Sequence, residues 1–225
     1  MAKDSASKSP KAPVDGIPSG VPKAVVSRLS LYLRELQHLV RDGQVTTNST
    51  ELGKLLGVTN AQVRKDLACF GQFGYPGVGY RCEELIAAIK NIMGTNQVWA
   101  VALVGVGNLG RALLGYRGFQ QQGFVIEAAF DTDATVIGET IDGVDVFPFE
   151  ALESVIHEKK IKLVILAVPA LAAQDVADVL VKAGIQGIMN FAPVTIKLPR
   201  QVSSVGMDLA IQLEQLSYSV VKQPE

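Results

Sequence analysis

The stretch VALVGVGNLG, residues 101–110, decides how the second half of this chain folds. Apolar residues run into Gly105, Gly107 and Gly110, which have the spacing G-x-G-x-x-G. This spacing is typical of a strand that turns into a helix beneath a dinucleotide pyrophosphate. Because the start of that helix offers unpaired N–H groups to phosphates, the remaining residues of the turn belong to the same predicted site. They are Val106, Asn108 and Leu109.

An acidic residue follows at the place where such a fold binds the adenosine ribose. Asp131 ends the apolar run 124–130 and lies 26 residues after Gly105. A carboxylate there accepts hydrogen bonds from the ribose hydroxyls and repels a 2′-phosphate, and Asp133 adds to that repulsion. No Arg or Lys lies between Asp131 and Glu139. We therefore expect NADH and NAD⁺ as cofactors, in preference to NADP(H).

The second half of the chain alternates strand-like runs with helical patterns. Strands are expected at 98–104, 124–130, 163–168 and 185–189, and helices at 108–116, 149–158 and 171–183. This alternation predicts an α/β fold with a parallel sheet, as in a Rossmann domain. Helical spacing returns at 208–220, where one face carries Leu209, Leu213, Leu216 and Val220.

The composition excludes several classes of protein. The net charge of −1 over 225 residues rules out a uniformly basic nucleic-acid binder, but not a local basic face. Two cysteines form no disulfide framework, and without Cys/His clusters we expect no metal. No apolar run spans a membrane, and the N-terminus lacks a signal-peptide core, so we expect a soluble cytoplasmic protein. Residues 1–20 have almost nothing to bury, and we expect a disordered tail there, to which we assign no function.

Few side chains suit catalysis at a nicotinamide. A dehydrogenase needs a general acid or base there, and the chain has only His38 and His157, both in helical patterns rich in charge. No paired catalytic constellation stands out, so we expect no catalytic residues. An NAD-dependent oxidoreductase with a helical accessory domain remains the alternative.

The first half of the chain contains a predicted helix-turn-helix. Asn48 and Glu51 have the spacing of a capping box, so a helix begins there. GVTN at 57–60 is a tight turn, after which Thr59 or Asn60 caps a second helix.

The second helix of this motif has two faces. Val63, Leu67 and Phe70 lie on one side, whereas the cations Arg64 and Lys65 point largely the other way, beside small residues. That arrangement suits close approach to a DNA major groove. FGQFGYPGVGY at 70–80 then predicts a β-hairpin wing, and a helix is expected at 22–40. Between residues 22 and 93 the cations exceed the acids by three, which supports DNA binding modestly.

The whole pattern resembles the Rex family of redox-sensing transcriptional repressors, from about residue 21 to 220. The motifs QVRKDLACFGQFGYPGVGY, LVGVGNLGRALLGY, AVPALAAQDVADVLVKAGI and MNFAPV occur in the family's order. The resemblance implies a homodimer that binds palindromic double-stranded operator DNA when NADH is scarce and releases it when NADH rises, without membrane contact and without turnover. It also implies that the C-terminal helix is exchanged in the dimer.

The resemblance divides the chain and assigns roles to its residues. The implied parts are a tail at 1–20, a winged-helix domain at 21–95, a Rossmann domain at 96–206 and a dimerisation helix at 207–225. Besides the glycine-rich turn and Asp131, the implied cofactor-binding residues are Val168, Pro169, Asn190, Phe191, Ala192, Pro193 and Tyr116. The expected DNA-binding residues are Thr59, Asn60, Gln62, Arg64, Lys65, Gly77, Tyr80 and Arg81. The implied switch residues are Arg34, Tyr116 and Asp208.

Two features depart from the family pattern. Many relatives have Lys or Arg where this chain has Pro76 at the wing, and Arg81 is the candidate replacement for that minor-groove contact. The N-terminal tail is also longer than usual.

Overall fold

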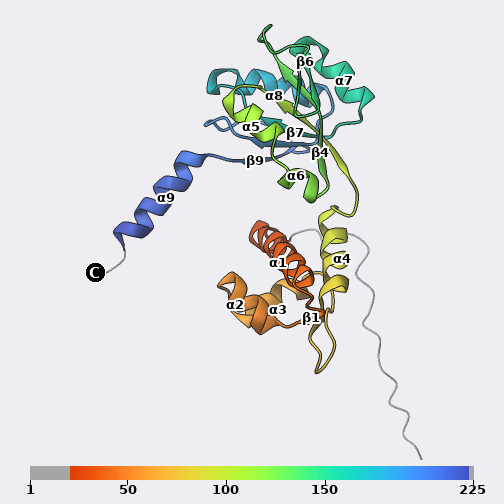
Figure 1. Ribbon diagram of the computed structural model, residues 1–225. Coiled ribbons are helices and arrows are strands. Elements are labelled where there is room, and N and C mark those ends of the chain that lie inside the picture. The colour runs from red at the N-terminus through yellow and green to blue at the C-terminus, as the bar shows by residue number, and fades with distance from the viewer. Residues whose placement is uncertain (1–20, 223–225) are drawn as a thin grey trace, which may run out of the picture. The chain divides into compact units, whose positions relative to one another are not determined.

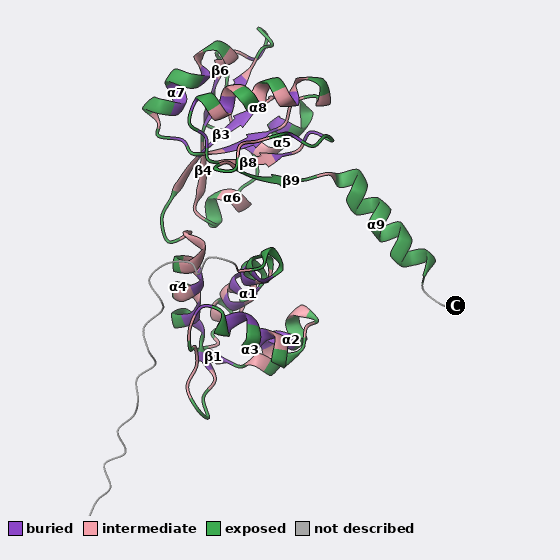
Figure 2. Ribbon diagram, turned by 180° about the vertical axis from the view of Figure 1, so that it is seen from behind, coloured by how far each residue is buried: buried purple, intermediate pink, exposed green. Residues whose placement is uncertain are grey.

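The computed structural model describes residues 21–222 and divides the chain into two compact units between Gln97 and Val98. Each unit has its own buried core (Figure 2). The stretch 1–20, predicted to be a disordered tail, lies outside the described residues.

The first unit is a winged helix. Its elements are α1 (Lys23–Arg41), β1 (Thr46–Thr47), α2 (Ser49–Leu56), α3 (Asn60–Ala68), β2 (Tyr80–Arg81) and α4 (Cys82–Met93), and Figure 1 labels the four helices and β1. Strands β1 and β2 pair antiparallel. Fully buried Leu29, Leu52, Val63 and Ile89 come from α1, α2, α3 and α4, so the four helices share one apolar core. The predicted helix-turn-helix is α2 and α3.

Both helices of that motif begin where local capping chemistry places them. The Asn48 side chain accepts hydrogen bonds from the N–H groups of Thr50 and Glu51, which confirms the predicted start of α2. Thr59, rather than Asn60, caps α3 by accepting from the Gln62 N–H. The capping box is only half formed, because the Glu51 carboxylate instead accepts from Thr47 Oγ1 and Gln44 Nε2.

The second unit is built on a seven-stranded sheet. Its strands are β3 (Trp99–Val104), β4 (Phe124–Asp131), β5 (Thr140–Ile141), β6 (Val144–Pro148), β7 (Leu163–Leu166), β8 (Gly187–Asn190) and β9 (Ser203–Gly206). Their order across the sheet is β5-β6-β4-β3-β7-β8-β9, and every pair is parallel except β5 with β6. The predicted parallel sheet is confirmed. The order of the strands reverses between β3 and β7, so one half of the sheet is built outward from β3 and the other from β7. In such sheets, ligands bind beside the carboxyl ends of the strands at this point.

Alternating side chains of the central strands pack on opposite layers of helices. Ala102 and Val104 face a core that includes α7 (Leu152–Glu158) and α8 (Ala173–Lys182). Val101 and Leu103 face the core that includes α5 (Asn108–Leu114) and Phe119 of α6 (Gly118–Gln121). Short 3₁₀ turns, η1 (Phe149–Ala151) and η2 (Ala170–Ala172), lead into α7 and α8.

Three strands and one helix of this unit were not predicted. The hairpin of β5 and β6 is short, α6 has only four residues, and β9 reads SSVG, which has no apolar alternation. Strand β9 forms because the exposed edge of β8 pairs with it from Gly187 to Asn190, which is a tertiary cause. After β8 the chain therefore forms a loop, the strand β9 and then the helix expected at 208–220.

Helix α9 (Leu209–Val221) closes the described chain and buries none of its residues (Figure 2). Asp208 caps its first turn by accepting from the N–H groups of Ala210 and Ile211. The four residues of its predicted apolar face are all exposed. A helix with such a face is stabilised mainly by packing, so α9 lacks its stabilising surface within one copy of the chain.

Candidate dinucleotide-binding and DNA-binding sites

The glycine-rich turn is shaped by backbone approaches that leave no room for side chains. Gly105 has φ of +97°, and a Cβ there would lie 2.5 Å from the carbonyl oxygen of Ala167. A Cβ on Gly110 would overlap the carbonyl oxygen of Gly105. By contrast, a Cβ on Gly107 would meet nothing within 4 Å. Gly105 and Gly110 therefore set the turn, while Gly107 leaves open the space that a pyrophosphate needs.

Asp131 connects the end of β4 to this turn. Its Oδ2 accepts a hydrogen bond from the Val106 N–H at 2.6 Å, and its Oδ1 accepts from the N–H groups of Thr132 and Asp133. The carboxylate is thus held at the carboxyl edge of the sheet, directly beside the turn. A ribose-binding carboxylate in a Rossmann domain also follows the second strand of the fold, at this edge of the sheet.

A cation that the sequence pattern did not reveal lies on the same side of the unit. Arg111, on α5, places Nη2 3.6 Å from Oε2 of Glu139. Hydrogen bonds from Thr135 lower the pKa of Asp133, and the charge of Arg111 adds to that effect. The local charge near Asp131 is therefore mixed, with Arg111 paired to Glu139. Only the fold brings α5 beside a loop 28 residues further along the chain.

Val168 and Pro169 follow β7 and lie at the turn, because a Cβ on Gly105 would be 3.1 Å from the Val168 nitrogen. The side chain of Asn190 is buried; its Oδ1 accepts from the Ala192 N–H and its Nδ2 donates to the Val194 carbonyl. Asn190 therefore shapes the Phe191–Pro193 segment through both atoms of its side-chain amide.

A hollow of about 270 Å³ joins this segment to the start of α9. It is lined by Asn190, Ala192, Pro193, Met207 and Asp208, among others. Asp208 uses Oδ1 to cap α9, which leaves Oδ2 without a hydrogen-bond partner among the described residues. The structure therefore brings Asp208, an implied switch residue, next to the implied cofactor-binding residues 190–193.

Tyr116 lies elsewhere in the unit. It follows the seven residues of α5, a length of roughly 10 Å from the glycine-rich turn. Its ring packs edge-to-face on Phe119 at 5.0 Å and rests over Gly118, where a Cβ would come within 2.5 Å of it. It lines a hollow that Asp142 also lines, and not the one beside Asn190. Within this unit, Tyr116 is therefore not placed with the other expected cofactor residues.

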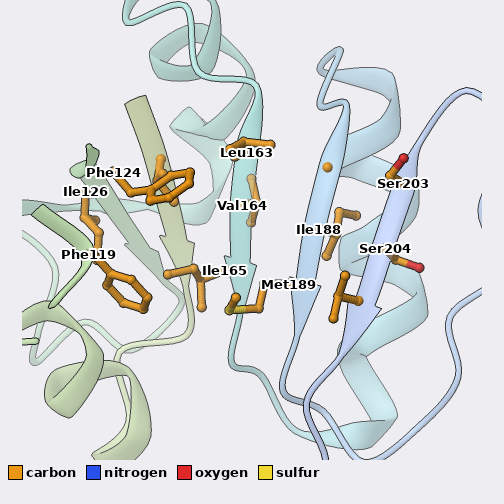
Figure 3. A pocket seen from close by; sticks show the side chains of 13 residues that line it. Phe119, Phe124, Ile126, Leu163, Val164, Ile165, Ile188, Met189, Ser203 and Ser204 are labelled. Carbon is orange, nitrogen blue, oxygen red and sulfur yellow. The ribbon is translucent and has the colours of Figure 1, made fainter. Parts of the chain in front are cut away.

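The sheet also carries an uncovered apolar hollow of about 360 Å³ (Figure 3). Phe119, Ile165 and Met189 line it, and β9 bounds it with Ser203 and Ser204. Buried apolar surface is what stabilises a sheet, so this face lacks part of its expected cover.

In the winged helix, the cations of α3 point outward as predicted. Arg64 and Lys65 are exposed, and Arg64 Nη1 donates to Ser49 Oγ at the start of α2. Asn60 is exposed in the first turn. Gln62 is less available than expected, because its Nε2 donates to Asp66 at 2.7 Å.

The wing places its expected DNA contacts unequally. Tyr75 and Gly79 form a bridge, with Pro76 and Gly77 exposed between them. The ring of Tyr80, expected to contact DNA, is instead a core residue at 8% exposure, because it packs in the winged-helix core. Arg81 donates to Glu84 and lies over the Tyr75 ring, so the candidate replacement for the cation absent at Pro76 already has partners in the domain.

Asp66 is a buried carboxylate of α3 that the sequence pattern did not single out. Only 1% of it is exposed, although it sits between the outward cations and the apolar face of α3. Arg28 and Tyr32 of α1 hold it, together with Gln62. A charged residue next to apolar helix positions was the available signal, but its partners lie 34 and 38 residues away.

Arg34 remains on the surface of α1. Its side chain is 59% exposed and makes one weak contact of 3.3 Å with Glu35. Such an exposed pair contributes little to stability, so Arg34 can exchange partners at small cost.

Within residues 21–222, no helix is both long and apolar enough to cross a bilayer. Among the described side chains, no group of three or more His, Cys, Asp or Glu is placed to hold a metal ion. Cys69 and Cys82 are free thiols.

Comparison with known proteins assigns both units. A family model described as "CoA binding domain" matches residues 96–194, and one described as "Putative DNA-binding protein N-terminus" matches residues 20–68. The redox-sensing transcriptional repressor Rex of Carboxydothermus hydrogenoformans is 48% identical over 200 residues, covering 89% of this chain and 96% of the relative. That of Pelotomaculum thermopropionicum is 46% identical over 202 residues, covering 90% and 95%.

Two solved structures of the Rex-family repressor RSP are similar to this chain over most of its length. One, in complex with β-NAD⁺ and operator DNA, is 38% identical with a TM-score of 0.85 and covers 89% of this chain and 92% of its own. The other, in complex with β-NADH, is 36% identical with a TM-score of 0.82 and covers 90% and 95%.

The geometry of Asp131 predicts cofactor choice. Asp131→Ala removes a charged acceptor for ribose hydroxyls and frees the Val106 N–H, so NADH binding should weaken by about 1.5–3 kcal/mol. Discrimination against NADPH should narrow, because the repelling charge is lost. Titration calorimetry with both cofactors measures this.

Asp133→Ala is the matched control, since it removes the same charge two residues away, from a side chain that bonds only within its own loop. Its NADH affinity should stay near that of the wild type. Equal affinity of the wild-type protein for NADH and NADPH would show that the ribose assignment is wrong.

Proposed function

Because this chain belongs to the Rex family of redox-sensing transcriptional repressors, we propose that it binds operator DNA when NADH is scarce and releases it when NADH binds. The observation that carries the proposal is that one chain contains both a DNA-binding fold and a dinucleotide-binding fold. One is a winged helix with outward cations on α3, and the other is a glycine-rich turn with a ribose carboxylate. We place this activity in the cytoplasm, where both operator DNA and the NADH pool are found.

The discrimination between NADH and NAD⁺ belongs at the nicotinamide end. The two cofactors differ only there, where the oxidised ring is cationic and planar. The glycine-rich turn and Asp131 bind parts that both cofactors share. Phe191 and Ala192, held in place by Asn190, offer an apolar wall that favours the neutral reduced ring. Val168 and Pro169 border the same edge of the sheet.

A ligand releases DNA only if it binds the DNA-free conformation better than the DNA-bound one. If NADH lowers operator affinity by a factor of about 100, the coupling free energy is about 2.7 kcal/mol, and DNA weakens NADH binding by the same factor. We propose that Arg34, Tyr116 and Asp208 of the partner subunit exchange partners in this transition. Exposed Arg34 and Tyr116 suit that role, because neither gives up a strong contact.

The alternative, an NAD-dependent oxidoreductase, predicts substrate-dependent NADH oxidation. The relatives that cover most of this chain are named as repressors, which disfavours it. The deciding experiment uses a palindromic operator found by footprinting genomic fragments. Fluorescence anisotropy should show NADH, and much less NAD⁺, releasing that operator from the protein. Operator affinity indifferent to NADH would rule out the proposed switch.

The exposed face of α3, the proposed recognition helix, predicts how one cation contributes to operator binding. Arg64→Ala should weaken operator binding by about 1–3 kcal/mol if Arg64 contacts a base edge. NADH affinity should not change. Arg41→Ala is the matched control, because Arg41 is an exposed arginine of the same unit at the end of α1. Unchanged operator affinity in Arg64→Ala would mean that another surface reads the DNA.

The proposed exchange of partners at Tyr116 predicts that one variant keeps NADH binding but loses NADH-dependent release of DNA. Tyr116→Phe keeps the ring that packs on Phe119 but removes the hydroxyl. It should leave NADH binding nearly intact and blunt DNA release in an NADH titration of operator-bound protein. If release occurs at the wild-type NADH concentration and to the same extent, the hydroxyl has no part in the relay.

The exposed face of α9 predicts a dimer formed by a second copy of this chain. A single winged helix reads only a half-site, so a palindromic operator requires two copies. Leu213→Glu places a charge on the apolar face and should convert the dimer to monomer in sedimentation velocity experiments. Gln215→Glu adds the same charge on another face of α9 and should remain dimeric. A dimeric Leu213→Glu variant would argue against this role of α9.

A further inference from the structure

Helix α3 contains a buried carboxylate, Asp66, whose hydrogen-bond donors come mostly from α1. Asp66 lies on α3 directly after Lys65 and faces inward, with 1% of its side chain exposed. Burial alone would raise the pKa of Asp66, but hydrogen bonds from Arg28, Tyr32 and Gln62 outweigh burial and lower it. Asp66 is therefore ionised, and its charge is balanced inside the domain.

The contacts of this carboxylate fix both of its oxygens. Arg28 donates from Nε to Oδ2 at 2.5 Å and from Nη2 to Oδ1 at 2.8 Å, which is a bidentate pair. The Tyr32 hydroxyl donates to Oδ2 at 2.7 Å, and Gln62 Nε2 donates to Oδ1 at 2.7 Å. Each oxygen therefore has two donors, and three of the four bonds come from α1.

These bonds constrain α3 in a way that apolar packing does not. Contacts such as those of Leu29 with the core are non-directional and tolerate small sliding or rotation of a helix. A bidentate guanidinium–carboxylate pair defines an orientation as well as a distance. Removing one partner leaves a buried charge short of compensation, so the pair also resists separation. Rotation of α3 relative to α1 is thereby opposed.

Helix α1 carries the implied switch residue Arg34 as well as the two residues that bind Asp66. Arg28 and Tyr32 are one turn apart on α1, and Arg34 follows half a turn later on a different, exposed face. On α3, neighbouring residues also face opposite ways, because Lys65 is exposed and Asp66 is buried. Helix α1 therefore connects the exposed guanidinium of Arg34 to Arg28 and Tyr32, which bind Asp66 of α3.

We propose that Arg28 and Tyr32 are positioning residues that make α1 and α3 move as one body through Asp66, so that a change of partner at Arg34 reaches the DNA-reading face of α3. This inference rests on the proposed NADH-dependent release of DNA. It adds the path within the winged helix by which release is transmitted.

The test is Tyr32→Phe in the full-length dimer, with Thr47→Val as the matched control. Each variant removes one buried hydroxyl that donates to a carboxylate at 2.7 Å, from Tyr32 to Asp66 and from Thr47 to Glu51. Only the first bond joins α1 to α3. The readout is the coupling ratio, which is the operator dissociation constant with saturating NADH divided by that without NADH. General destabilisation of the winged helix would affect both variants alike.

Tyr32→Phe should reduce the coupling ratio by roughly fivefold or more, which corresponds to the loss of about 1 kcal/mol of coupling. Thr47→Val should keep the ratio within about twofold of wild type. NADH affinity of the DNA-free protein should be the same in all three. Arg28→Lys, which keeps the charge but loses the bidentate geometry, should behave like Tyr32→Phe and serves if that variant does not fold.

A wild-type ratio in Tyr32→Phe and Arg28→Lys would overturn the inference while leaving the proposed switch intact. Equal losses in Tyr32→Phe and Thr47→Val would overturn it too, because the effect would then be general weakening of the domain. If wild-type protein itself shows no effect of NADH on operator binding, the proposed function fails, and that result is distinct from the other two.

Discussion

The sheet unit depends on the absence of side chains where β3 turns into α5. The backbone of Gly105 lies against the end of β7, and the first turn of α5 lies against Gly105 in turn. Any Cβ at Gly105 or Gly110 would separate these segments. The same contacts bring Val168 and Asp131 to the turn, so the Asp131 carboxylate, the glycine-rich backbone and the loop after β7 share one edge of the sheet. This edge is where we propose that the dinucleotide binds.

The polar side chains of the chain divide into those already satisfied and those free to change partner. Asn190 shapes its own loop, and Arg81 is held by Glu84 and Tyr75. Arg34 and Tyr116, by contrast, are exposed with weak or purely aromatic contacts. This division suits a switch, because rigid groups keep the two sites shaped while a few loosely held groups move between alternatives at small energetic cost.

One copy of the chain leaves apolar surface uncovered. Helix α9 exposes its whole leucine face, and the sheet carries an open hollow lined by Phe119, Ile165 and Met189 (Figures 2 and 3). Contiguous apolar surface of this kind is typical of protein–protein interfaces. The dimer proposed above supplies two winged helices for a palindromic operator and a second copy of the chain to cover this apolar surface.

The sequence by itself determined the features that depend on neighbouring residues. Glycine spacing, the Asn48 cap and apolar periodicity predicted the dinucleotide turn, the helix-turn-helix and the parallel sheet, because these report local backbone preferences and burial along one element. Strand β9 was missed because its residues are polar and its pairing comes from the open edge of β8. The Arg28–Asp66 and Arg111–Glu139 pairs were missed because each joins residues about 30 to 40 positions apart. Only the tertiary structure decides such pairs, since a buried charge is stable wherever packing brings its counter-charge, and periodicity along the chain carries no information about that distance in space.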